Sequence, residues 1–147
     1  MVCSVTPVPF HPALIVIVGP TASGKSALAQ RVALEMKGEI ISCDSVALYR
    51  GLDIGSAKQG LAERAQVRHH GIDLLSPDQP STAGDYARHA KAAARAIAAR
   101  DALPILSGGT GLYLGATLDG LAPAPARDEA FRQRLRMHVE RRGSASL

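Results

Sequence analysis

The chain has 147 residues, of which 46% are hydrophobic and 20% are charged, so it is long enough and apolar enough to bury one sizeable core. Its net charge of +4 suits a polyanionic partner, but an aromatic content of 3% excludes base stacking as a broad means of binding nucleic acid. No apolar run approaches the length needed to cross a membrane.

The first part of the chain predicts a loose tail, then a strand and a helix on either side of a glycine loop. Residues 1–12 contain three prolines and fit a flexible tail better than a signal peptide. Residues 14–18 form an apolar run typical of a buried strand, and residues 27–36 are expected to be helical. Lys37 and Gly38 predict the end of this helix, with the glycine in the left-handed position.

The loop between these elements matches the phosphate-binding pattern G-x-x-x-x-G-K-[ST] at every fixed position. Its residues are Gly19, Pro20, Thr21, Ala22, Ser23, Gly24, Lys25 and Ser26. Backbone N–H groups, a helix N-terminus and the Lys25 ammonium together predict a site for a di- or triphosphate. A glycine-rich turn without a ligand is the alternative.

The phosphate-binding loop and the two distant cysteines, Cys3 and Cys43, favour a reducing, cytoplasmic setting for the chain.

The rest of the chain predicts further alternation of strands and helices. Strands are expected at residues 39–43 and 103–107, with a weaker one at 69–75; residues 44–66 predict a long functional loop with short helical turns. Thr82 and Asp85 have the spacing of a capping box before an alanine-rich helix that reaches about residue 100. Helices are also expected at about 111–118 and at 128–142.

This order predicts parallel strands with right-handed crossovers. We therefore expect an α/β fold, a three-layer α/β/α sandwich with a parallel sheet of the P-loop NTPase-like kind. Residues 13–126 would form the core, and residues 127–147 would contain a basic helix.

Asp44 directly follows a predicted strand, where the active sites of open parallel sheets gather. A carboxylate there could accept a proton from an attacking nucleophile, while the alternative is a cap of a turn. Lys25 is expected on the terminal phosphates, and Ser26 on a divalent metal unless its hydroxyl only caps the first helical turn.

Three other features have a structural and a functional interpretation. The turn at residues 108–111 could be a plain tight turn, or its N–H groups and the Thr110 hydroxyl could meet the same anion. His69 and His70 point to opposite faces of a strand, so a structural role is favoured over metal binding. The arginines of the last helix form a solvated face or contact a phosphodiester backbone.

Four segments in order resemble one family, the tRNA dimethylallyltransferases. The phosphate loop has that family's Pro-Thr-Ala-Ser interior, and residues 44–58, residues 69–73 and residues 103–113 are similar to its other signatures. The resemblance implies transfer of a dimethylallyl group from dimethylallyl diphosphate to the N6 amine of a flipped-out adenosine beside the anticodon of tRNA. It also implies Mg²⁺ as cofactor.

The resemblance also implies roles for individual residues. Asp44 matches the family's proposed general base, Lys25 and Ser26 would stabilise the leaving diphosphate with magnesium, and Thr110 matches a position near the diphosphate and the RNA. The residues implied to contact tRNA are Asp44, Ser45, Val46, Ala47, Thr110 and Arg132.

The sequence departs from the family pattern at two places. Val46 and Ala47 stand where the family often has a glutamine. The chain also ends where a helical insertion would begin in the family, so we expect a fragment in which residues 127–147 include the start of a truncated insertion and the sheet is incomplete at its C-terminal side. A P-loop small-molecule kinase that uses ATP and an inactive truncated domain are the alternatives. A monomer is favoured.

Overall fold

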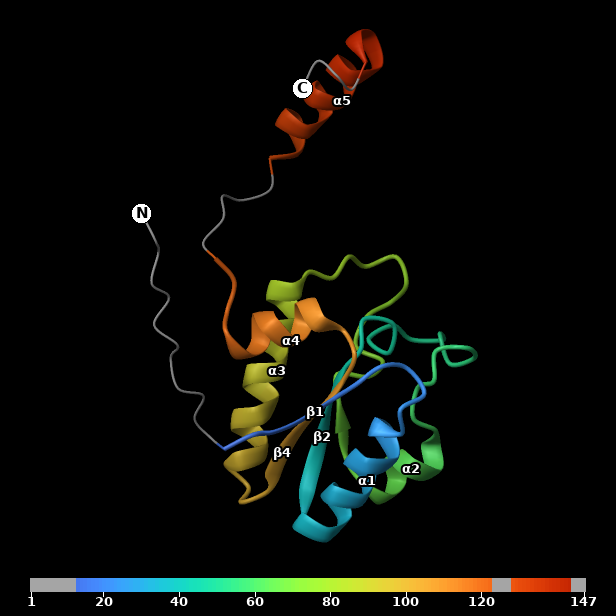
Figure 1. The fold of residues 1–147 in the computed structure, drawn as a ribbon, viewed down its shortest axis with the longest axis vertical. Coiled ribbons are helices and arrows are strands. Elements are labelled where there is room, and N and C mark those ends of the chain that lie inside the picture. The colour runs from blue at the N-terminus through green and yellow to red at the C-terminus, as the bar shows by residue number, and fades with distance from the viewer. Residues whose placement is uncertain (1–12, 123–127, 144–147) are drawn as a thin grey trace.

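The computed structural model describes residues 13–122 and 128–143, and Figure 1 shows their arrangement. The elements in chain order are β1 (Ile15–Val18), α1 (Lys25–Met36), β2 (Gly38–Cys43), α2 (Leu61–Gln66), β3 (His69–His70), α3 (Ala83–Ala98), β4 (Leu103–Gly108), α4 (Gly111–Leu118) and α5 (Glu129–Arg142). The predicted alternation of strands and helices is confirmed. The tail predicted at residues 1–12 lies outside the described residues. No described helix is both long enough and apolar enough to span a membrane.

The strands form one parallel sheet in the order β1-β4-β2-β3. Val18 at the end of β1 and Cys43 at the end of β2 are both in register with Gly108 at the end of β4. Because these three strands end level, the loops after them begin at one edge of the sheet. The phosphate loop, Asp44 and Thr110 are therefore carried to the same edge, as predicted.

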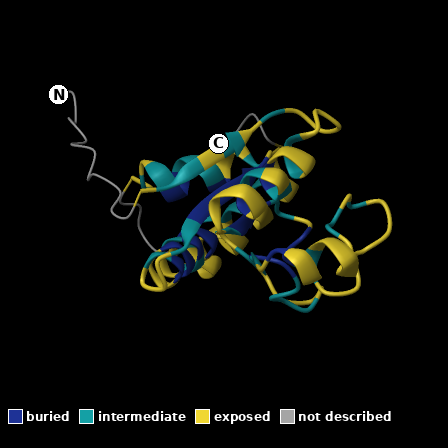
Figure 2. Ribbon diagram, turned by 90° about the horizontal axis from the view of Figure 1, so that it is seen from below, coloured by how far each residue is buried: buried dark blue, intermediate teal, exposed yellow. Residues whose placement is uncertain are grey.

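Each face of the sheet packs its own hydrophobic core, because successive side chains of a strand point to opposite faces. On one face, Ile40 and Ile105 pack with Ala29 and Ala33 of α1. On the other face, strand residues pack with α3 and α4; the buried members of this core are Ile41, Cys43, Leu48, Tyr86, Ala90, Ala93, Ala94, Ile97, Leu106 and Tyr113. The buried strands lie between helices whose outer surfaces are exposed (Figure 2). The predicted three-layer α/β/α arrangement is confirmed.

The junction between α1 and β2 differs from the prediction. Lys37, not Gly38, takes the left-handed conformation, with φ of 52°. Gly38 is instead the first residue of β2, where an added Cβ would lie 2.8 Å from the Leu103 carbonyl oxygen and from Ile105 Cδ1. The glycine is therefore required by the close approach of β2 to β4 and not by the helix end.

Two further segments refine the sequence-based expectations. The third strand is shorter than predicted, since β3 has two residues and only an isolated bridge between Tyr49 and Leu75 comes after it. The capping box of α3 is confirmed: the Thr82 hydroxyl accepts from the Asp85 N–H at 3.1 Å, and the Asp85 carboxylate accepts from the Thr82 N–H at 3.2 Å.

The predicted basic helix is present as α5, which lies apart from the α/β body in Figure 1. Asp128 caps it by accepting from the Phe131 N–H at 2.8 Å. No residue of α5 is buried, and Phe131 and Met137 are 50% and 45% exposed. The apolar side chains of this helix are therefore not part of either core.

Candidate functional site

The phosphate loop connects β1 to α1 through a tight left-handed turn. Ala22 and Gly24 have φ of 63° and 80°, and the Ser23 N–H donates to the Pro20 carbonyl at 3.3 Å. Gly24 is the N-cap of α1, and no side chain caps the helix. The first N–H groups of the helix therefore keep their hydrogen-bonding capacity and their partial positive charge for an anion.

Lys25 adds a full positive charge to this helix end. Its ammonium donates to the Pro20 carbonyl at 3.1 Å and forms no ion pair with any other residue that the structure describes. The side chain thus folds back over its own loop. Because its charge is not neutralised there, Lys25 is available to a phosphate group.

Asp44 follows β2, and the structure shows one of its two predicted roles, the cap of a turn. Its Oδ1 accepts from the Val46 N–H at 2.8 Å and from the Ala47 N–H at 3.3 Å, so it caps the turn after the strand. Its Oδ2 has no hydrogen-bond partner among the described residues. Asp44 also lines the same cavity as Lys25 and Ser26, so the second oxygen remains for a ligand.

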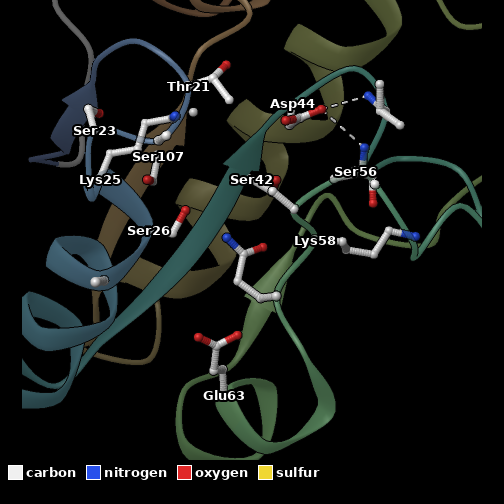
Figure 3. Close-up of a pocket in the computed structure, with 18 of the residues that line it drawn as sticks. Thr21, Ser23, Lys25, Ser26, Ser42, Asp44, Ser56, Lys58, Glu63 and Ser107 are labelled. Carbon is white, nitrogen blue, oxygen red and sulfur yellow. Dashed lines mark hydrogen bonds between the residues drawn. The ribbon is translucent and has the colours of Figure 1, made fainter.

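This cavity has a volume of about 810 Å³ and lies at the edge of the sheet where the strands end. In Figure 3 the side chains of Ser23, Lys25 and Ser26 lie on one side, and Asp44 lies on the other. Residues within 52–59 form the outer wall, which includes the exposed side chains of Leu52 and Ile54, and Glu63 of α2 lies beside them. The cavity therefore joins a cationic loop to a carboxylate and an apolar rim.

Lys58 holds this outer wall in place, a role that the sequence analysis did not assign. Its side chain is 2% exposed, and its ammonium donates to Asp53 at 2.7 Å, to Asp73 at 2.9 Å and to the Tyr49 carbonyl at 2.8 Å. Arg64 binds the other oxygen of Asp73 at 2.8 Å. The hydrogen bond from Lys58 is the main cause that lowers the pKa of Asp73. Burial opposes the charge on Lys58, but its two carboxylate partners outweigh burial and raise its pKa.

Thr110 connects the loop after β4 to the loop after β2. Its hydroxyl accepts from the Ser45 N–H at 3.1 Å, and its own N–H donates to the Cys43 carbonyl at 3.2 Å. The strands approach so closely here that a Cβ on Gly108 would lie 2.1 Å from the Cys43 carbonyl oxygen. Thr110 does not line the large cavity but a smaller hollow of about 300 Å³ on which Gly19 and Pro20 also border.

The residues that the resemblance assigns to tRNA are not all brought together. Val46 is 42% exposed, whereas Ala47 is 2% exposed and its N–H is bonded to Asp44. Of these two residues, Val46 is the one whose side chain is exposed to solvent. Arg132 lies on α5, apart from the α/β body and the other predicted site residues (Figure 1).

The two adjacent histidines have partners within the fold. His70 Nε2 lies 2.6 Å from a Glu39 carboxylate oxygen, and His69 Nδ1 lies 2.8 Å from the Val67 carbonyl oxygen. Burial lowers the pKa of His69. These contacts agree with a structural role for both side chains.

Comparisons with known proteins point to one family. A model of the IPP transferase family matches residues 47–147, and a model described as isopentenyl transferase matches residues 12–73. The tRNA dimethylallyltransferase of Koribacter versatilis is 52% identical over 136 residues, which are 92% of this chain and 44% of that protein.

Solved structures give the same result. The tRNA isopentenylpyrophosphate transferase of Bacillus halodurans superposes with a TM-score of 0.73 at 39% identity, over 90% of this chain and 44% of that one. A eukaryotic dimethylallyltransferase described as acting on tRNA has a TM-score of 0.72 at 28% identity, over 83% of this chain and 31% of that one. The chain thus spans less than half the length of these relatives.

Proposed function

The chain belongs to the IPP transferase family, and from this premise we propose that its 810 Å³ cavity binds dimethylallyl diphosphate for transfer of the dimethylallyl group to tRNA. The acceptor would be the N6 amine of an adenosine next to the anticodon. The observation that carries the proposal is that Lys25, Ser26 and Asp44 line one cavity. The names of the relatives favour tRNA prenylation over phosphoryl transfer by a kinase.

The arrangement suits a displacement at the allylic carbon. The adenine nitrogen forms a bond to that carbon, the bond from carbon to oxygen breaks, and its electron pair leaves with the diphosphate. The N-terminus of α1 and Lys25 stabilise the negative charge that grows on the leaving oxygens. The free oxygen of Asp44 accepts the proton that the nitrogen loses.

Magnesium fits the donor set on the phosphate side of the cavity. Among the described residues, no three His, Cys, Asp or Glu side chains are grouped to hold a metal by themselves. Ser26 offers a hydroxyl oxygen there, and Mg²⁺ prefers oxygen ligands that include substrate phosphates and water. Bound in this way, the ion would supply charge neutralisation for the leaving diphosphate.

An RNA acceptor is consistent with the charge of the chain. The net charge is +4, and the arginines on α5 are exposed. Arg132 and the other α5 arginines would contact phosphates of the tRNA, and Val46 would lie near the flipped base. Both contacts belong to this proposal.

Thermal unfolding tests the ligand assignment. Pyrophosphate and dimethylallyl diphosphate, each with magnesium, should raise the unfolding temperature more than ATP does at equal concentration. A ligand at about 100 times its Kd stabilises a protein by about 2.7 kcal/mol. Lys25→Met should remove most of the increase because it removes the charge nearest to the phosphates.

Lys91→Met is the matched control, since Lys91 lies on α3 and away from the cavity lining. It should respond to the ligands like the unchanged chain. Stabilisation by ATP alone, or an undiminished response of Lys25→Met, would contradict the assignment.

A further inference from the structure

Two serines at the strand ends are not used by the proposed chemistry. Ser42 is 4% exposed and Ser107 is 7% exposed, yet both line the cavity that Lys25 and Ser26 line. They are in register on the neighbouring strands β2 and β4. Figure 3 shows both side chains within the same cavity as Ser26. We call Ser26, Ser42 and Ser107 the hydroxyl floor.

Ser42 and Ser107 face the same side of the sheet because alternate residues of a strand point to the same face. Ile40 and Ile105 lie two residues earlier on their strands and pack against α1. Ser42 and Ser107 therefore also face the α1 side of the sheet. Ser26 lies in the first turn of α1 and lines the same cavity.

The floor hydroxyls have no protein partner. No hydrogen bond joins the Oγ of Ser26, Ser42 or Ser107 to another residue within the described part of the chain. By contrast, the hydroxyl of the buried Thr117, which is 1% exposed, donates to the Tyr113 carbonyl at 2.7 Å, and that of the buried Tyr86 donates to the Ser42 carbonyl at 2.8 Å. Ser42 and Ser107 thus present hydroxyls to the cavity that no protein group binds, and polar groups in such a place are satisfied by water or by a ligand.

The chemistry of the floor indicates the nature of that ligand. Phosphate-loop enzymes commonly hold Mg²⁺ with the loop hydroxyl and a carboxylate from a neighbouring strand. Here the neighbouring strands offer neutral hydroxyls, which both donate and accept hydrogen bonds. Water has the same capacity, and Mg²⁺ keeps several of its waters when it binds with phosphates.

We propose that Ser42 and Ser107 bind the water shell of a magnesium ion that reaches the cavity with the diphosphate. The inference rests on the proposed diphosphate site and adds two residues to it. It assigns the serines to the hydrated cation and not to the phosphate oxygens. Their effect on binding should therefore depend on the metal.

Calorimetric titration with inorganic pyrophosphate tests this assignment, once with magnesium and once with EDTA. Ser107→Ala and Ser42→Ala should each reduce the magnesium-dependent gain in affinity by about fivefold, the effect of one lost hydrogen bond. The affinity measured in EDTA should not change. Without ligand, each variant should unfold at nearly the same temperature as the unchanged chain, because the substitution removes no hydrogen bond to another described residue.

Thr117→Val is the control for loss of a buried hydroxyl outside the cavity. It should lower the unfolding temperature, because it breaks a hydrogen bond, and leave the effect of magnesium on affinity unchanged. Three outcomes would overturn the proposal. The serine variants could keep the full magnesium effect, lose affinity equally in EDTA, or fail to fold, which would show that the hydroxyls support the fold.

The test also separates this inference from the proposed function. If the unchanged chain binds no pyrophosphate, the diphosphate site itself is wrong, and the role of the serines is overturned with it. If the chain binds pyrophosphate with a magnesium effect that the serine variants retain, only the assignment of the floor is wrong.

Discussion

Asp44 shows how one side chain can serve the fold and the site. One carboxylate oxygen accepts two backbone N–H groups, and this fixes the side chain at the edge of the cavity. The other oxygen is left for a ligand. If Asp44 is the base of the proposed reaction, it needs no large movement to meet an incoming amine, which lowers the cost of orienting it.

Substitution of Asp44 separates these two roles. Asp44→Ala removes the acceptor of the turn and should lower the free energy of unfolding by about 1 kcal/mol. Asp44→Asn keeps an acceptor oxygen and should cost less than half of that. Because it removes a negative charge from the cavity, Asp44→Asn should bind pyrophosphate as tightly as the unchanged chain or more tightly. Urea unfolding and calorimetry measure both effects, and equal destabilisation by the two variants would contradict the capping role.

At the level of elements, the loop at residues 52–59 depends on ion pairs for its position. Lys58 connects this loop to Tyr49 and to Asp73, which lies just after β3. Arg64 of α2 binds the same carboxylate. The outer wall of the cavity is thus joined to two other segments through one buried ammonium.

Removal of that ammonium should loosen the wall. Lys58→Met should lower the free energy of unfolding by about 2 kcal/mol, since hydrogen bonds to charged groups are lost and Asp53 and Asp73 lose a counter-charge. Limited proteolysis should then cut within residues 52–57 faster than in the unchanged chain. Arg31→Met is the control, because Arg31 pairs with Glu35 on the exposed surface of α1 and should change stability by less than about 0.5 kcal/mol. Equal protease resistance of Lys58→Met and the unchanged chain would rule out the anchoring role.

For the whole molecule, acid should destabilise the fold in two stages. Burial lowers the pKa of His69 and His89, so their neutral forms are favoured in the fold. The unfolded chain then binds more protons than the fold below the ordinary histidine pKa of 6.5, and stability falls as the pH falls from there. Burial alone would raise the pKa of Glu39. Hydrogen bonds with His70 and Arg100 outweigh the effect of burial, so the pKa is lowered. Asp73 has a lowered pKa as well, so a second loss occurs below the ordinary carboxyl values of 4.5 and 3.8.

Urea unfolding between pH 7.5 and about pH 3 measures this profile. His89→Asn should make the first stage shallower and leave the second in place, because one of the two histidines with a lowered pKa is removed. A stability that stays constant between pH 7 and pH 5 would contradict the account of the buried histidines.

The sequence predicted those parts of the molecule that depend on local patterns. The phosphate loop, the strand before it, the alternation of elements and the Thr82 capping box are all determined by neighbouring residues. The prediction that Gly38 ends α1 in a left-handed conformation is wrong. The glycine is needed because β2 approaches Leu103, which is distant in the chain. The contact of Lys58 with Asp73 and the pairing of Ser42 with Ser107 also depend on tertiary structure and register.

The central claim is that the phosphate loop and Asp44 belong to one site for a prenyl diphosphate. An NMR titration of the chain with dimethylallyl diphosphate and magnesium tests it most directly, because each backbone N–H reports separately. We predict that signals of residues 19–26 and of residues 44–47 shift together with one common Kd. Shifts in the phosphate loop that leave residues 44–47 unchanged at saturation would contradict the claim.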